Sequence, residues 1–145
     1  MASEYLSNFG TVTVTDTTLA LTAGGYASQT IVSDLAAAQT FTLPAATGSG
    51  NLYRIFVKTT KTGSLIVQVT TTDVMSGAIG VSTDAAGVVI PTAATSDTLT
   101  MNGTTTGGVA GSYAEFQDVA SGVWRVGGAL ASTGAEATPF SAAVS

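Results

Sequence analysis

The side chains that most often carry out acid–base or nucleophilic chemistry are scarce in this chain of 145 residues. It contains no His and no Cys. This excludes a Ser-His-Asp triad, a thiolate nucleophile and the Cys or His ligands of a structural zinc site. What remains is nine Asp and Glu, four Lys and Arg, and many hydroxyl groups, with a net charge of −5.

Three of the four cations, Arg54, Lys58 and Lys61, lie close together, with Tyr53 and Phe56 among them. A basic patch with aromatic side chains is one signature of nucleic-acid binding. The alternative is a strand that turns a basic stripe toward solvent or a neighbouring subunit. Because a chain with a pI of about 4.1 repels phosphate, we favour the alternative. We expect no nucleic-acid partner, and the three cations are candidate contacts with a capsid or subunit surface.

The carboxylates form no readable catalytic or metal-binding motif. Glu115 and Asp118 are three residues apart on a predicted strand, so they point to opposite faces, whereas a glycosidase needs two facing carboxylates. Asp73, Asp84 and Asp97 fall in predicted turns, where Asp caps backbone groups. We therefore expect no enzyme activity, no catalytic residue, no cofactor and no metal ion.

Trp124 is the single Trp of the chain and shares a face of a predicted strand with Val126. An exposed Trp would suggest stacking against a sugar or insertion into a membrane interface. A buried Trp would anchor the core of the last hairpin, which is the interpretation that we favour.

Alternation of apolar and polar residues predicts short strands along most of the chain. Thr11 to Thr15 alternates Thr with Val. Tyr53, Ile55 and Val57 share one face of a strand, and Leu65, Val67 and Val69 share a face of the next one. About eight to ten such strands, separated by turn residues, predict an all-β chain. We expect a single β-sandwich of jelly-roll-like type with antiparallel strands.

Local signals suggest how some strands connect. Residues 60–63 and Asn102-Gly103 are typical of hairpin turns, and residues 120–122 would join a last hairpin of 113–119 and 123–126. Val88-Val89-Ile90 predicts a short buried strand stopped by Pro91. Residues 35–38 predict one helical turn, with Asp34 as its N-cap.

The ends of the chain differ in composition from the middle. We expect an N-terminal arm at residues 1–10, a sandwich domain at 11–130 and a C-terminal arm at 131–145. Tyr5, Leu6 and Phe9 give the N-terminal arm apolar side chains, which are further candidate contacts with a neighbouring subunit. There is no run of about 20 apolar residues, so no membrane partner is expected.

Several blocks of the sequence, in this order, resemble a family of small virion proteins. They are Thr40-Phe41-Thr42-Leu43-Pro44-Ala45-Ala46 with Gly50 and Tyr53, Asp73-Val74-Met75-Ser76-Gly77, residues 99–108, Gly122-Val123-Trp124-Arg125-Val126 and Glu136-Ala137-Thr138-Pro139-Phe140. Together they are similar to the head decoration (capsid cement) proteins of tailed phages, notably marine and cyanobacterial phages. The resemblance covers about residues 40–140.

The resemblance implies a structural protein on the outer surface of the virion capsid, with the major capsid protein as partner. It also implies self-association, with a homotrimer expected and a dimer as the rival. Low charge agrees, because a surface with few ions loses little solvation when it is buried in an assembly. A head-fibre or tail component that binds a host receptor is the alternative, and a carbohydrate-active enzyme is a more distant one.

Overall fold

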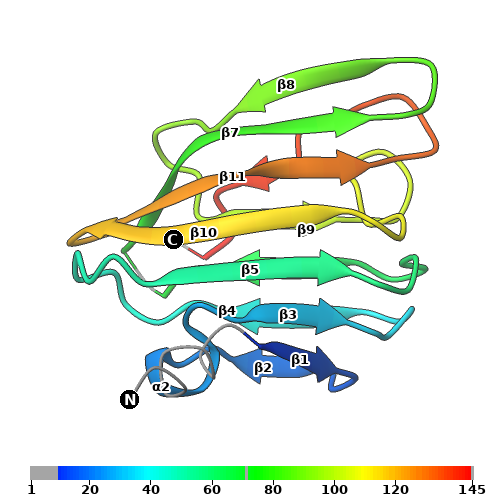
Figure 1. Cartoon of the computed structure of the whole chain (residues 1–145). Helices are drawn as coiled ribbons and strands as arrows, with labels where there is room; N and C mark the ends of the chain where they lie inside the picture. Colours follow the sequence, from blue (N-terminus) through cyan, green and yellow to red (C-terminus); the bar gives the residue numbers. More distant parts are fainter. Residues whose placement is uncertain (1–9, 71, 145) are drawn as a thin grey trace.

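Two β-sheets pack face to face in the computed structural model, which describes residues 10–70 and 72–144 (Figure 1). One sheet has seven strands in the order β1-β3-β5-β10-β11-β7-β8, and the other has five in the order β12-β9-β6-β4-β2. The elements are β1 Thr11–Val14, β2 Thr18–Ala20, α2 Ala23–Tyr26, β3 Thr30–Ser33, β4 Gln39–Thr42, β5 Leu52–Val57, β6 Leu65–Gln68, β7 Val74–Ser82, β8 Gly87–Pro91, β9 Thr98–Met101, β10 Tyr113–Ala120, β11 Val123–Ala131 and β12 Phe140–Ser141. The expected all-β sandwich is confirmed.

The core lies between the two sheets and follows the alternation of the sequence. Tyr53, Ile55 and Val57 are buried on β5, and Leu65 and Val67 are buried on β6. Trp124 is fully buried, and its ring meets that of Tyr53 edge to face, with centroids 5.6 Å apart. Trp124 therefore anchors the core, as the sequence predicts, and contributes the aromatic pairing energy of such contacts.

The first six strands alternate between the sheets. The chain places β1, β3 and β5 in the seven-stranded sheet and β2, β4 and β6 in the five-stranded sheet. From β3 to β6, each strand lies parallel to the strand placed two strands earlier in the chain, which gives the pairs β1–β3, β3–β5, β2–β4 and β4–β6. The expectation of antiparallel strands throughout is wrong for these strands and for β7 and β11, which also pair in parallel, because alternation within a strand does not encode the direction of its partner.

This winding also corrects the predicted turn at residues 60–63. The segment joins β5 to β6, which belong to different sheets, so it crosses the edge of the sandwich and closes no hairpin. The Asn102-Gly103 prediction fails for the same reason, because the loop that begins there connects β9 in one sheet to β10 in the other. Instead, the Asn102 side-chain oxygen accepts the backbone N–H groups of Thr104, Thr105 and Thr106.

The second half of the chain contains antiparallel hairpins. The predicted last hairpin is confirmed as β10 and β11, with Phe116 opposite Val126. A second hairpin, β7–β8, forms the upper edge of the seven-stranded sheet in Figure 1. The Val88-Val89-Ile90 strand exists, but Val88 and Val89 are exposed rather than buried, and Pro91 belongs to the strand rather than stopping it. The reason is that β8 is an edge strand at the margin of the sandwich.

Two other local predictions differ from the structure. Residues 35–38 form no helical turn, and the Asp34 side chain binds Lys58 and Thr59 instead. The short helix α2 begins after Thr22, whose hydroxyl accepts the Gly25 N–H. The C-terminal segment, expected as an arm, contributes β12, which pairs with β9. Residues 1–9 of the expected N-terminal arm, with Tyr5, Leu6 and Phe9, lie outside the described residues.

Candidate interaction surface

The outer face of the seven-stranded sheet carries a row of apolar side chains in cross-strand register. Strand pairing places Val32 beside Phe56, Phe56 beside Tyr113, Tyr113 beside Ala129, Ala129 beside Gly80, and Gly80 beside Val89. The immediate chain neighbours of these residues include the buried Ile31, Ile55, Ala114, Leu130, Ile79 and Val81, so the row faces away from the core. We call these six residues the apolar row.

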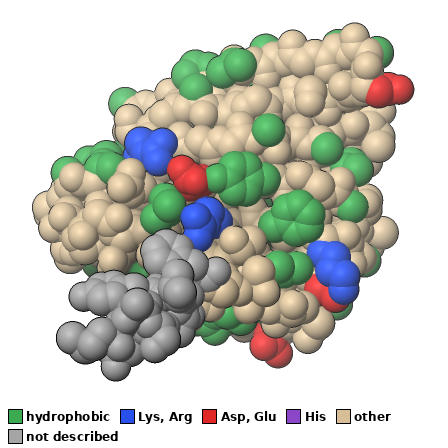
Figure 2. All heavy atoms as spheres, viewed as in Figure 1, with side chains coloured by type: hydrophobic (Ala, Val, Ile, Leu, Met, Phe, Trp, Pro, Cys, Tyr) green, Lys and Arg blue, Asp and Glu red, His purple; other side chains and the backbone are tan. Residues whose placement is uncertain are grey.

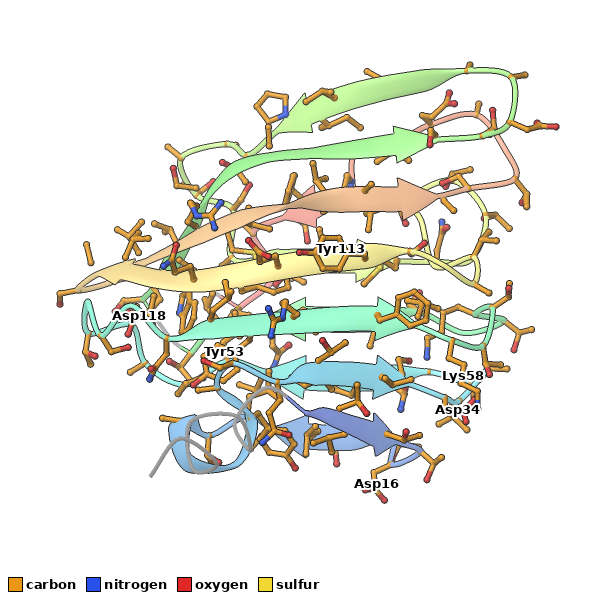
Figure 3. The ribbon with its side chains drawn as sticks, viewed as in Figure 1. Asp16, Asp34, Tyr53, Lys58, Tyr113 and Asp118 are labelled. Atoms are coloured by element: carbon orange, nitrogen blue, oxygen red, sulfur yellow. The ribbon has the colours of Figure 1, made fainter. Side chains whose placement is uncertain are left out.

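The apolar row is open to solvent along most of its length. Phe56 is 37% exposed and Val89 is 70% exposed, and the labelled Tyr113 lies in the middle of the sheet in Figure 3. Gly80 and Ala129 contribute almost no side chain, so the β11–β7 part of the row is low and flat. Figure 2 shows this face with few charged side chains among apolar and uncharged ones.

A polar cluster lies beside the apolar row on β10 and β11. Glu115 accepts the Tyr113 hydroxyl at 2.5 Å and pairs with the Arg125 guanidinium at 3.0 Å. The hydrogen bond from Tyr113 is the main reason that the pKa of Glu115 lies below its ordinary value. Burial, followed by the bond to Glu115, raises the pKa of the Tyr113 phenol. The charged groups of this cluster, Glu115 and Arg125, are therefore paired with each other on this face.

The predicted basic stripe is not a single surface. Arg54 lies on the outer face, where its Nη2 donates to the Ser28 carbonyl at 2.6 Å. Lys58 lies beyond the end of β5 and pairs with Asp34 at 2.6 Å, as Figure 3 shows. That pairing is the main reason that the pKa of Asp34 is lowered. Arg54 and Lys58 thus remain candidate contacts, each with a partner inside the chain.

Lys61 departs most from the sequence-based expectation, because it is only 3% exposed. Its ammonium donates to the Leu35 carbonyl at 2.5 Å and to the Gln39 side-chain oxygen at 2.6 Å. Burial lowers the pKa of Lys61 to about 8. The residue lies in the crossing between the sheets, where the alternation of β5 no longer applies, so it is not a surface contact.

Asp118 organises a loop that sequence reasoning did not single out. It is 3% exposed at the end of β10. Its carboxylate accepts the backbone N–H groups of Thr47, Gly48 and Ser49 and the Ser49 hydroxyl at 2.7–3.1 Å. Burial opposes ionisation, but these hydrogen bonds outweigh it and hold the pKa of Asp118 at about 2. Glu115 and Asp118 do lie on opposite faces, as predicted.

Two other carboxylates have comparable structural roles. Asp73 accepts the Ala46 N–H at 2.7 Å, and Asp97 accepts the N–H groups of Ala143 and Val144. Asp73 and Asp97 cap backbone groups, as expected for Asp in turns. Within residues 10–70 and 72–144, no three Asp or Glu side chains gather as a metal site would require. The described part of the chain also has no helix long and apolar enough to cross a membrane.

Two open hollows flank β7. One, of about 250 Å³, is lined by Gly80, Val81, Ser82, Gly87, Val88 and Val89 and is almost entirely apolar. The other, of about 290 Å³, is lined by Val74, Met75, Ser76, Thr92, Ala93, Ala94 and Val123. Neither contains an ionisable side chain. The first continues the apolar row to the β8 edge.

Comparison of the chain with protein-family models, with curated proteins and with solved structures gave no match in any of the three.

Proposed function

We propose that this chain is a structural protein of a tailed-phage head, bound to the outer surface of the capsid, where it bridges subunits of the major capsid protein. The apolar row is the observation that carries the proposal, because it offers a broad, weakly charged surface to another protein. The ordered sequence blocks that resemble head decoration proteins supply the particular assignment.

The structure favours apolar contact over ionic attachment for such a surface. Lys61 is buried, Lys58 and Arg125 are paired with carboxylates, and Arg54 already donates to a carbonyl. Exposed ion pairs contribute only about 0–1 kcal/mol each, and salt at about 0.1 M screens exposed charges over about 10 Å. Attachment through the apolar row should therefore depend little on salt.

The test is binding of the purified protein to heads that lack it, across a salt series up to about 1 M NaCl. We expect Phe56→Ser to weaken binding at least tenfold, because Phe56 is the largest fully apolar side chain of the row. Val119→Ser is the matched control, since Val119 is 47% exposed on β10 but lies outside the row. Equal binding by both variants, or a hundredfold loss of affinity with salt, would contradict the proposal.

One observation favours the alternative of a head-fibre or tail component that binds a host receptor. Phe56 and Tyr113 are aromatic neighbours on an open face beside Arg125 and Glu115, an arrangement suited to stacking against a sugar. Copy number in purified particles distinguishes the two functions. Hundreds of copies agree with decoration of the head, and a handful agrees with a fibre.

A further inference from the structure

The outer edge of β8 has hydrogen-bonding groups whose direction follows from the pairing with β7. Thr92 donates its N–H to the Gly77 carbonyl at 2.9 Å, and the Ala86 carbonyl accepts the Thr83 N–H at 2.8 Å. On the β8 side, both bonds are made by even-numbered residues, Thr92 and Ala86, whose backbone groups point toward β7. Because residues of an antiparallel strand alternate in the side to which they bond, Gly87, Val89 and Pro91 direct their backbone groups away from the sheet.

These outward-pointing backbone groups include fewer donors than acceptors. Pro91 has no N–H, so the edge offers two donors, on Gly87 and Val89, and the three carbonyl groups of Gly87, Val89 and Pro91. The edge strand is otherwise unprotected. Val88 and Val89 are 45% and 70% exposed, and residues 85–96 contain no charged side chain. An exposed apolar edge without charges is a template for pairing with another strand.

We propose that β8 pairs antiparallel with β8 of a second copy of this chain, about a two-fold axis at Val89. In this register the two Val89 residues exchange both backbone hydrogen bonds. Gly87 of each copy faces Pro91 of the other, so the Gly87 N–H donates to the Pro91 carbonyl. Both donors of the edge are then paired. Because Pro91 has no N–H, the Gly87 carbonyl of each copy receives no bond from the other strand and is left to bind water.

The side chains match in the same register. Val88 lies opposite Ile90 of the other copy on one face of the joined sheet, and the two Val89 side chains lie side by side on the other face. Apolar pairs of this kind favour strand association, and no charge is desolvated. Figure 2 shows apolar side chains along this edge of the molecule. An isologous contact of this kind closes as a dimer, the rival of the homotrimer that the sequence analysis favours.

The absence of Cys from the chain allows a direct test with single Cys variants. Residues that form a hydrogen-bonded antiparallel pair have Cα atoms about 5.5 Å apart, which suits a disulfide. We expect Val89→Cys to cross-link rapidly as a dimer under mild oxidation. The matched control is Ser82→Cys, which is exposed on the same face but one strand away from the axis. Equal rates of cross-linking for the two variants would refute the proposed register.

The uncross-linked protein provides the second test, by sedimentation equilibrium over a concentration series. We expect the mass of two chains for the unmodified protein. Val89→Pro, which removes the central donor, and Val89→Lys, which places two charges at the axis, should each weaken association at least a hundredfold. Circular dichroism confirms that the variants remain folded. A monomer at about 100 µM or a trimer would overturn the proposal, whereas loss of capsid binding by Phe56→Ser would leave it unaffected.

Discussion

The carboxylate of Asp118 holds residues 47–49 by replacing the hydrogen bonds that water would otherwise make to their N–H groups. Asp118→Ala removes the buried acceptor of these N–H groups, so we expect a loss of about 1–3 kcal/mol in the free energy of unfolding. Urea denaturation measures this loss. Asp84→Ala, in the exposed turn between β7 and β8, is the control and should change stability by less than about 0.5 kcal/mol.

Asp118 also makes the free energy of unfolding depend on pH in the acidic range. Its pKa of about 2 in the folded protein lies below the unfolded value of about 3.9. The unfolded chain therefore binds the proton more readily, and the contribution of Asp118 is present above about pH 4 and lost as the pH falls toward 2. Asp118→Asn should flatten this part of the stability curve. An unchanged acid transition in the variant would assign the effect to other groups.

Lys61 makes stability rise with pH as well, but in a higher pH range. Its pKa of about 8 in the folded protein lies below the unfolded value of about 10.4. Between these values the unfolded chain holds the extra proton, so raising the pH favours the folded state. We expect the free energy of unfolding to rise between pH 8 and 10 relative to that of Lys61→Met. Lys58→Met, whose amine is exposed, should retain the rise, and its loss there would contradict our assignment to Lys61.

Within the strands, alternation predicted which side chains are buried. Tyr53, Ile55 and Val57 face inward because they belong to one continuous strand, and Trp124 follows the same rule. Lys61 escaped this reasoning because it lies in a crossing, where the direction of a side chain depends on both sheets. The role of Asp118 could not be read either, since its partners lie about 70 residues earlier in the chain.

At the level of elements, β12 is short but closes one side of the five-stranded sheet. Phe140 is 8% exposed and lies opposite Leu99, and the Ser141 carbonyl accepts the Asp97 N–H at 2.9 Å. We expect Phe140→Ala to cost about 3–5 kcal/mol. Phe56→Ala, which removes an exposed ring of the same size, should cost much less. Thermal denaturation of both variants checks the difference, and equal stability would show that β12 packs only weakly.

Pairings between strands close in sequence were predictable, whereas pairings across the sandwich were not. The β10–β11 hairpin has a two-residue connection, Ser121-Gly122, and local turn chemistry is sufficient to identify it. The same reasoning misled at residues 60–63 and 102–103, because turn residues also occur where a chain changes sheets. The apolar row is a further example. Its members come from six strands, so only the register brings them together.

The molecule as a whole combines two patterns of strand connection. Residues 11–68 alternate between the sheets and stack parallel strands, whereas the later strands include the two antiparallel hairpins. Composition and alternation were enough to predict two packed β-layers. They could not distinguish parallel from antiparallel neighbours, because both arrangements bury every second side chain.

The alternating winding of the first six strands restricts how this protein can change in length. One turn of the winding contributes a strand to each sheet, and Thr30 stands between Thr11 and Arg54 in successive turns. A duplication of a whole turn would add one strand to each sheet, and a deletion would remove one strand from each. The difference in strand number between the two sheets would then stay the same. Loss of a single strand would send every later strand to the wrong layer. Viable insertions and deletions in this half should therefore be confined to the crossings or come as complete turns.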